Sequence, residues 1–210
     1  MNRTRLEAFS DGVFAVAITL LALDLAVEGP GHGHTLLWQQ LGHKWPAFVA
    51  YLISFFTIGV IWVNHHMMMN GVVVVTRGLL YLNLLLLAVV VAIPFATSTL
   101  ADYLTSPWPD GNTAAALYAG VFELMSIGFL LVSEWVLRHD EYVREPMPMA
   151  AKAPARLSFY AGQLPYLIAF GAAFVSVPAT VIITAVTGIY YIFVRTYAPP
   201  TPSARDMPLE

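Results

Sequence analysis

Polar side chains interrupt the first apolar segment of the chain, where residues 5–25 read RLEAFSDGVFAVAITLLALDL. Ser10 and Asp11 lie near its start, Thr19 follows further along, and Asp24 lies near its end. A carboxylate costs at least about 2.5 kcal/mol near the centre of a bilayer, so a membrane helix turns such a side chain toward protein. These residue types therefore indicate two kinds of chemistry, which are buried polar anchoring and the passage of an ion.

A second polar group, WVNHH, closes the next apolar segment. It contains Trp62, Asn64, His65 and His66, and Arg77 follows it before the third segment. If the chain crosses the membrane back and forth, this group lies on the same side as the start of the first segment. We expect one polar network to brace the first helix against its own subunit. Its predicted members are Arg5, Phe9, Ser10, Asp11, Trp62, Asn64, His65, His66 and Arg77.

An apolar stripe runs along the first segment when its residues are placed at 100° per residue, and Asp11 then lies roughly opposite. Its members are Phe9, Gly12, Val16, Thr19, Leu20, Leu23 and Val27. Helix packing inside the bundle explains such a stripe without any further function. Alternatively, the stripe lines an ion path, where valine and leucine side chains close a narrow gate by dewetting and Thr19 supplies hydroxyl oxygens.

The composition places these segments in a membrane protein. Hydrophobic residues make up 58% of the 210-residue chain and charged residues 11%, whereas soluble domains average about 25% charged. Cysteine is absent, which excludes disulfides and thiolate metal sites. The histidines have no zinc-type spacing, and nucleotide-binding and hydrolase motifs are missing. We therefore expect no metal, no cofactor, no enzyme activity and no nucleic-acid partner.

The apolar segments predict an all-α fold with six transmembrane helices in one domain, residues 1–197. The last long apolar stretch is too long for one span, and Pro178 divides it because proline cannot continue a helix hydrogen-bond ladder. Residues 198–210 are expected to form a disordered cytoplasmic tail. The predicted spans are residues 8–27, 46–63, 79–100, 114–137, 157–177 and 179–195.

The basic residues predict the orientation. With the N-terminus inside the cell, the outer loops contain Lys44 as their only Lys or Arg, and every other such residue lies inside. Both termini are then cytoplasmic. Dividing the last stretch supports this topology, because a single helix there would place Arg195 and Arg205 outside.

The same residues resemble a known family. Arg5 followed after three residues by Phe9-Ser10-Asp11, the continuation GVFAVAITLL, WVNHH, Arg77 and NLLLLAVVVAIPF together resemble the transmembrane protein 175 family. Its members are lysosomal and prokaryotic potassium-permeable channels. The resemblance covers about the first hundred residues and implies a single-repeat, prokaryotic type of channel in the plasma membrane.

This resemblance implies a homotetramer whose first helices surround a central pore for monovalent cations. It implies a gate at Val16, potassium preference at Thr19 and a further apolar ring at Leu23. Val16 is smaller than the leucine or isoleucine expected there, so Leu20 and Leu23 are alternatives for the narrowest point. No re-entrant loop or TVGYG filter is present, so we expect modest selectivity for K⁺ over Na⁺. The expected partners are further copies of the chain, membrane lipids and the permeant ion.

Two other functions compete with this prediction. A proton-coupled secondary transporter would use the intramembrane carboxylates Asp11, Asp24 or Glu123. An intramembrane enzyme would use His65 and His66 together with Asp11.

Overall fold

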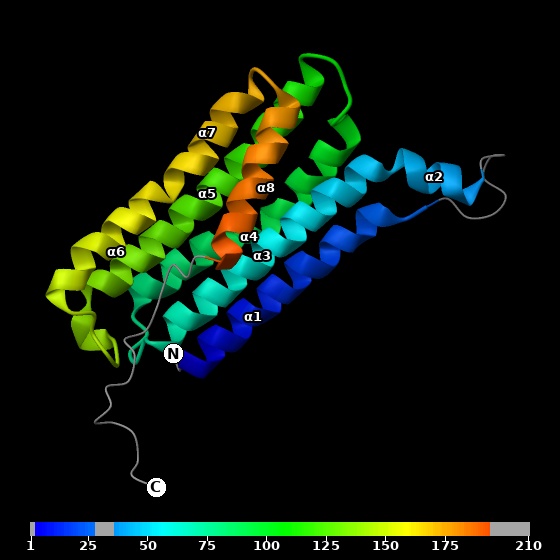
Figure 1. The fold of residues 1–210 in the computed structure, drawn as a ribbon. Helices are drawn as coiled ribbons and strands as arrows, with labels where there is room; N and C mark the ends of the chain where they lie inside the picture. Colours follow the sequence, from blue (N-terminus) through cyan, green and yellow to red (C-terminus); the bar gives the residue numbers. More distant parts are fainter. Residues whose placement is uncertain (1–2, 28–35, 194–210) are drawn as a thin grey trace, which may run out of the picture.

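The chain folds into a bundle of long helices that run along one common axis (Figure 1). The computed structural model describes residues 3–27 and 36–193. Within these ranges the backbone forms helices and turns, and one isolated antiparallel bridge joins Val72 to Val143. The helices are α1 (Arg3–Leu20), η1 (Leu21–Leu25), α2 (Leu37–His43), α3 (Trp45–Asn70), α4 (Arg77–Tyr103), α5 (Asp110–Arg138), η2 (Asp140–Tyr142), α6 (Met149–Ala161), α7 (Gln163–Ala173) and α8 (Val177–Phe193).

Four helices of the described part are long and apolar enough to cross a membrane. They are Arg3–Leu23, which includes the start of η1, together with α3, α4 and α5. The apolar helix α8, with 17 residues, is shorter. The predicted all-α membrane architecture is therefore confirmed. The short helix α2, which the sequence did not predict, projects from the far end of the bundle (Figure 1).

The region predicted as a fifth span, residues 157–177, differs from the expectation. Two consecutive helices occupy it, because α6 ends at Ala161 and α7 runs from Gln163 to Ala173. Gly162 separates them, and a Cβ atom at this position would lie 2.5 Å from the hydroxyl oxygen of Tyr191. The break therefore lies where the Tyr191 side chain of α8 packs against the backbone between α6 and α7. A turn then leads into α8, whose second residue is Pro178, a position that needs no helical N–H donor.

Helix α4 packs against α1, α3 and α5. It approaches α5 closely at Gly128, where a Cβ atom would lie 3.2 Å from the Cα of Leu86. Small residues allow such contacts between membrane helices because the backbones can approach each other. Gly128 therefore sets the distance between the two most extensively packed helices.

A chain of buried hydroxyl groups links α3, α4 and α5. Thr97 donates to the Ile93 carbonyl (2.8 Å), so its oxygen accepts from Ser54 (2.8 Å), whose oxygen in turn accepts from Tyr118 (3.1 Å). Ser54, Thr97 and Tyr118 are all buried. Each hydroxyl proton in this chain has an acceptor, which removes the cost of burying these groups in an apolar core.

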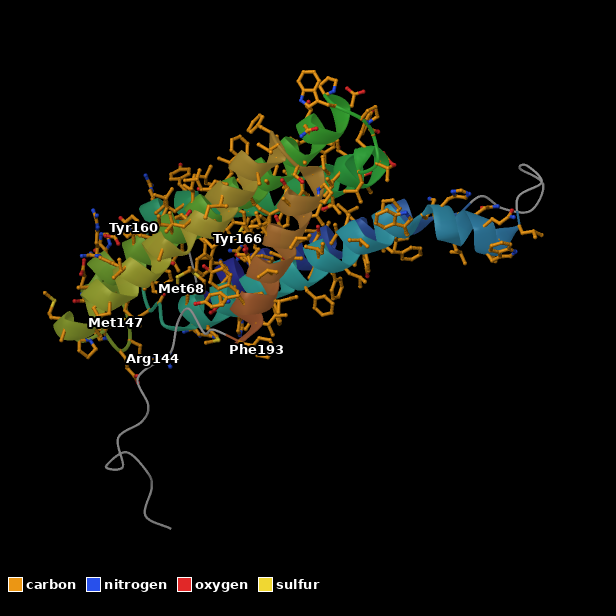
Figure 2. The ribbon with its side chains drawn as sticks, turned by 45° about the horizontal axis from the view of Figure 1, so that its top comes forward. Met68, Arg144, Met147, Tyr160, Tyr166 and Phe193 are labelled. Carbon is orange, nitrogen blue, oxygen red and sulfur yellow. The ribbon has the colours of Figure 1, made fainter. Side chains whose placement is uncertain are left out.

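Two turns are joined at the end of the bundle that carries Arg3. The amide of Val73, after α3, donates to the Tyr142 carbonyl (2.7 Å), and the amide of Arg144 donates to the Gly71 carbonyl (2.8 Å). Figure 2 shows Arg144 and Met147 at this end, beside the start of α6. The first and second halves of the chain are therefore held together here by backbone hydrogen bonds.

Candidate functional site

One face of the first helix is exposed on the surface of the described part of the chain. Every member of the apolar stripe predicted from the sequence is exposed. The largest exposed fractions among the pore candidates are 54% for Val16 and 68% for Leu23, and Leu20 is 37% exposed. The stripe therefore does not pack inside the bundle of a single chain, which was the simpler of the two explanations.

The opposite face of α1 supplies its contacts with the bundle. Leu6, Ser10, Phe14, Ala17 and Leu21 are each at most 2% exposed. They recur every three or four residues, which is the spacing of one face of a helix. The exposed stripe is thus a separate face, and α1 packs through its buried face against α3 and α4.

Thr19 lies on the exposed stripe, and its hydroxyl is oriented by the helix itself. The hydroxyl donates to the Val16 carbonyl at 2.9 Å. A hydroxyl has one donor and two acceptor lone pairs, so this hydrogen bond leaves oxygen lone pairs available away from the backbone. Thr19 can therefore offer oxygen, but no second proton, to a group that faces the stripe.

A buried polar chain anchors α1 to α3 and α4. Ser10 donates to the Leu6 carbonyl (2.9 Å), so its oxygen accepts from the Asn83 side-chain amide (3.0 Å). The Asn83 carbonyl oxygen then accepts from His65 Nε2 (2.7 Å), which assigns the proton to that nitrogen. All three side chains are at most 1% exposed. The three polar groups satisfy one another in a buried site, where the low local dielectric constant makes such bonds strong.

Asp11 lies beside this chain and makes a separate contact with α3. Trp62 Nε1 donates to Asp11 Oδ1 at 2.8 Å. The centroids of the Trp62 and His66 rings also lie 5.9 Å apart, and those of the His65 and Phe14 rings lie 5.4 Å apart. Asp11 is only partly buried and does not belong to the exposed stripe. The aspartate therefore points toward α3, with an indole N–H as its partner.

The structure brings together only part of the predicted network. It links Ser10 to His65 through Asn83, and separately Asp11 to Trp62, whose ring lies beside that of His66. Arg5, Phe9 and Arg77 are exposed, and in the described ranges no hydrogen bond or ion pair connects them to the network. Asn64 is buried, but its amide donates to the Val60 carbonyl of its own helix at 2.9 Å.

Asn83, the centre of the buried chain, was not among the predicted site residues. It is the polar residue in an otherwise apolar run, YLNLLLLAVVV. A lone amide in a membrane helix usually bonds to another helix, so this pattern is a signal that could have identified it. Arg3, also not predicted, pairs with Glu7 (3.3 Å) and donates to the Asn70 carbonyl (2.9 Å), which joins the ends of α1 and α3.

Two further predictions fall on residues that the structure does not describe. The side chain of Asp24 is outside the described part, as are residues 194–210, which include Arg195, Arg205 and the predicted tail. The other transporter candidate, Glu123, lies on α5 and takes no part in the α1 site.

Comparison with known proteins shows the relationships of the chain. Residues 5–94 match the family of the endosomal/lysosomal potassium channel TMEM175, and this range contains both the exposed stripe and the buried chain of α1. A potassium channel of Streptomyces collinus is 43% identical over 95% of this chain and 96% of its own length. The human endosomal/lysosomal proton channel TMEM175 is 34% identical over 70% of this chain, which corresponds to 30% of the human protein.

A solved structure agrees with the fold over nearly the whole chain. The crystal structure of a lysosomal potassium-selective channel TMEM175 homologue from Chamaesiphon minutus has a TM-score of 0.80 and 36% identity. The match covers 93% of this chain and 98% of that one. From the sequence motifs, the helical membrane architecture and these relatives, we conclude that the chain belongs to the TMEM175 family.

Proposed function

We propose that the protein is a potassium-permeable cation channel, assembled as a homotetramer with α1 of each subunit around the central pore. The observation that carries this proposal is the exposed apolar stripe of α1. A continuous apolar face on a membrane helix that packs through its other face is available for a neighbouring subunit or for a pore. In the tetramer, Val16, Thr19, Leu20 and Leu23 face the central path.

Gating and selectivity follow from the chemistry of these side chains. Val16, Leu20 and Leu23 form apolar rings that close the path by dewetting when they narrow. Thr19 contributes a ring of hydroxyl groups. Each donates its proton to the Val16 carbonyl of its own helix, so its oxygen is left to contact an ion. Hydroxyl oxygens replace only part of the hydration shell of an ion, so the preference for K⁺ over Na⁺ is modest. The permeant ion is the cargo, and no cofactor takes part.

The predicted topology belongs to the same proposal. Six membrane crossings place both termini in the cytoplasm, in the plasma membrane of a prokaryote. The basic residues near the Arg3 end of the bundle, which include Arg5, Arg77, Arg144 and Arg156, support this orientation through the positive-inside rule. In this orientation, α2 and Lys44 lie on the outer side of the membrane.

Recording from purified protein in planar bilayers tests the function. With KCl on one side and NaCl on the other, we expect unitary currents whose reversal potential shows K⁺ preference. A proton-coupled transporter would give saturating flux without unitary currents, and that outcome would reject the channel.

A further inference from the structure

A groove on the surface of the bundle lies between α5 and α7, away from the first helix. It encloses about 680 Å³, within the range of small-molecule sites. Leu117, Leu124 and Ile127 line it from α5, and Leu167 and Phe170 line it from α7. Helix α1 packs against α3 and α4 but not against α5 or α7, so the groove is separate from the face assigned to the pore.

Gly120 shapes the wall of this groove. A Cβ atom at position 120 would lie 3.3 Å from Cε2 of Phe170. The absence of a side chain therefore lets the Phe170 ring pack directly on the α5 backbone. A hollow remains beside this contact, and its apolar walls come from two helices that pack extensively on each other.

Glu123 is the charged residue among the described residues that line the groove. Its Oε2 atom is buried, and no hydrogen-bond donor in the described ranges reaches it. Glu123 lies near the middle of α5, roughly 20 Å from either helix end at about 1.5 Å per residue. In a helix that spans the bilayer this position lies near the middle of the hydrocarbon core, where an unpaired charge is costly.

We propose that this groove binds a lipophilic amine that enters from the membrane, with its ammonium group paired to Glu123 and its apolar body against the α5 and α7 side chains. Charge complementarity carries the assignment. The site offers one carboxylate without a donor, and an ammonium group supplies both an N–H donor and the opposite charge. Apart from Thr113, the remaining lining residues are apolar and match a hydrocarbon chain or an aromatic ring.

Photolabelling of the full-length protein in liposomes tests the proposal. The probe is a tertiary amine with an alkyl chain that carries a diazirine, and labelled peptides are identified by mass spectrometry. We expect labelling of the 117–127 and 167–170 segments, reduced by excess unlabelled amine. A charged hydrogen bond in such a site corresponds to at least about a tenfold affinity change, so Glu123→Gln should raise the half-saturating probe concentration by at least that factor.

Three further measurements separate the proposal from simpler explanations. Leu124→Trp fills the groove but keeps the carboxylate, and it should also reduce labelling. Leu131→Gln adds an amide to an exposed α5 position outside the groove, and its labelling should equal that of the wild type. A probe with an amide in place of the amine should bind at least about tenfold more weakly.

Equal labelling of Glu123→Gln, or equal labelling by the neutral probe, would overturn the proposal. Either result would show that the groove collects apolar molecules without using the carboxylate. If Glu123→Gln does not assemble, as judged by size-exclusion chromatography, the Leu124→Trp variant and the neutral probe decide the question.

Discussion

Thr19 and Val16 share one hydrogen bond, yet the proposed pore gives them opposite tasks. The Thr19 hydroxyl donates to the Val16 carbonyl, so the same bond that fixes the threonine rotamer exposes its oxygen. Val16 presents only methyl groups from the same stripe. Selectivity and closure are therefore separable by single substitutions.

Thr19→Ala should lower the K⁺/Na⁺ permeability ratio toward one, because the oxygen ring is lost while the helix backbone is unchanged. The shift in bi-ionic reversal potential measures this. Thr99→Ala is the matched control, since Thr99 makes the same kind of bond, to the Phe95 carbonyl at 2.9 Å, on α4 outside the site. An unchanged ratio in Thr19→Ala would remove the selectivity role.

Val16→Ala should increase open probability or conductance, because a smaller apolar ring dewets less readily. Single-channel recordings measure both quantities. Val91→Ala, at an exposed position of α4, controls for the loss of methyl groups elsewhere on the surface. Recordings that do not differ from the wild type would place the gate at Leu20 or Leu23 instead.

Asn83→Leu should destabilise the protein strongly, because it leaves the buried His65 Nε2 donor without its acceptor and the buried Ser10 oxygen without the donor it accepts from. Each such group costs about 1–3 kcal/mol. Thermal unfolding in detergent and size-exclusion chromatography measure the effect. The control is Asn70→Leu, at an exposed position whose carbonyl, not its side chain, accepts from Arg3. A melting temperature equal to that of the control would contradict the anchoring role.

The sequence identified most polar members of this anchor but not their arrangement. Asp11, Trp62 and His65 could be placed on one side of the membrane by counting spans, since topology alone determines that. Which amide accepts from His65 depends on the rotation of α4, which a single apolar run does not reveal. For the same reason Arg5 and Arg77 were assigned to the network although their side chains are exposed.

At the scale of elements, helix packing rather than hydropathy decides where helices end. A hydropathy reading extends the fifth helix from residue 157 to 177, because Gly162 does not interrupt the apolar run. The structure ends α6 at Ala161, and the Tyr191 hydroxyl of α8 packs beside Gly162, where the next helix begins. Contacts between residues distant in sequence are invisible to a window of neighbouring residues. In contrast, the long apolar runs of α4 and α5 predicted their helices to within a few residues.

Gly128→Leu should disrupt the packing of α4 on α5, because the added side chain collides with the Leu86 backbone. Overpacking of this kind costs about 1–3 kcal/mol, and we expect a lower melting temperature. Gly59→Leu is the matched control, since a Cβ atom there meets nothing within 4 Å. If both variants melt at the same temperature, Gly128 does not determine the distance between these helices.

At the scale of the whole molecule, the exposed stripe of α1 is the strongest reason to expect an assembly. The sequence predicted which residues share this face, because helical periodicity determines it. It could not decide between internal packing and an exposed face, since that depends on where the other helices lie.

The absence of cysteine allows the assembly to be tested with single introduced thiols. Leu23→Cys should give disulfide-linked dimers on oxidation in membranes, because equivalent residues meet around the proposed axis. Leu157→Cys, on the exposed surface of α6, should remain monomeric on denaturing gels. Equal cross-linking of the two variants would contradict a pore formed by α1.

The two contacts that α1 makes through consecutive residues have a mechanical consequence. Asn83 binds Ser10 and Trp62 binds Asp11, from two different helices. Turning α1 about its long axis by even one residue, about 100°, would break both bonds at once. In the proposed channel, the N-terminal half of α1 therefore keeps a fixed rotation relative to α3 and α4. The Val16 ring then keeps its position, and movement within the path belongs to Leu23, which lies on the 3₁₀ turn of η1 beyond the end of α1.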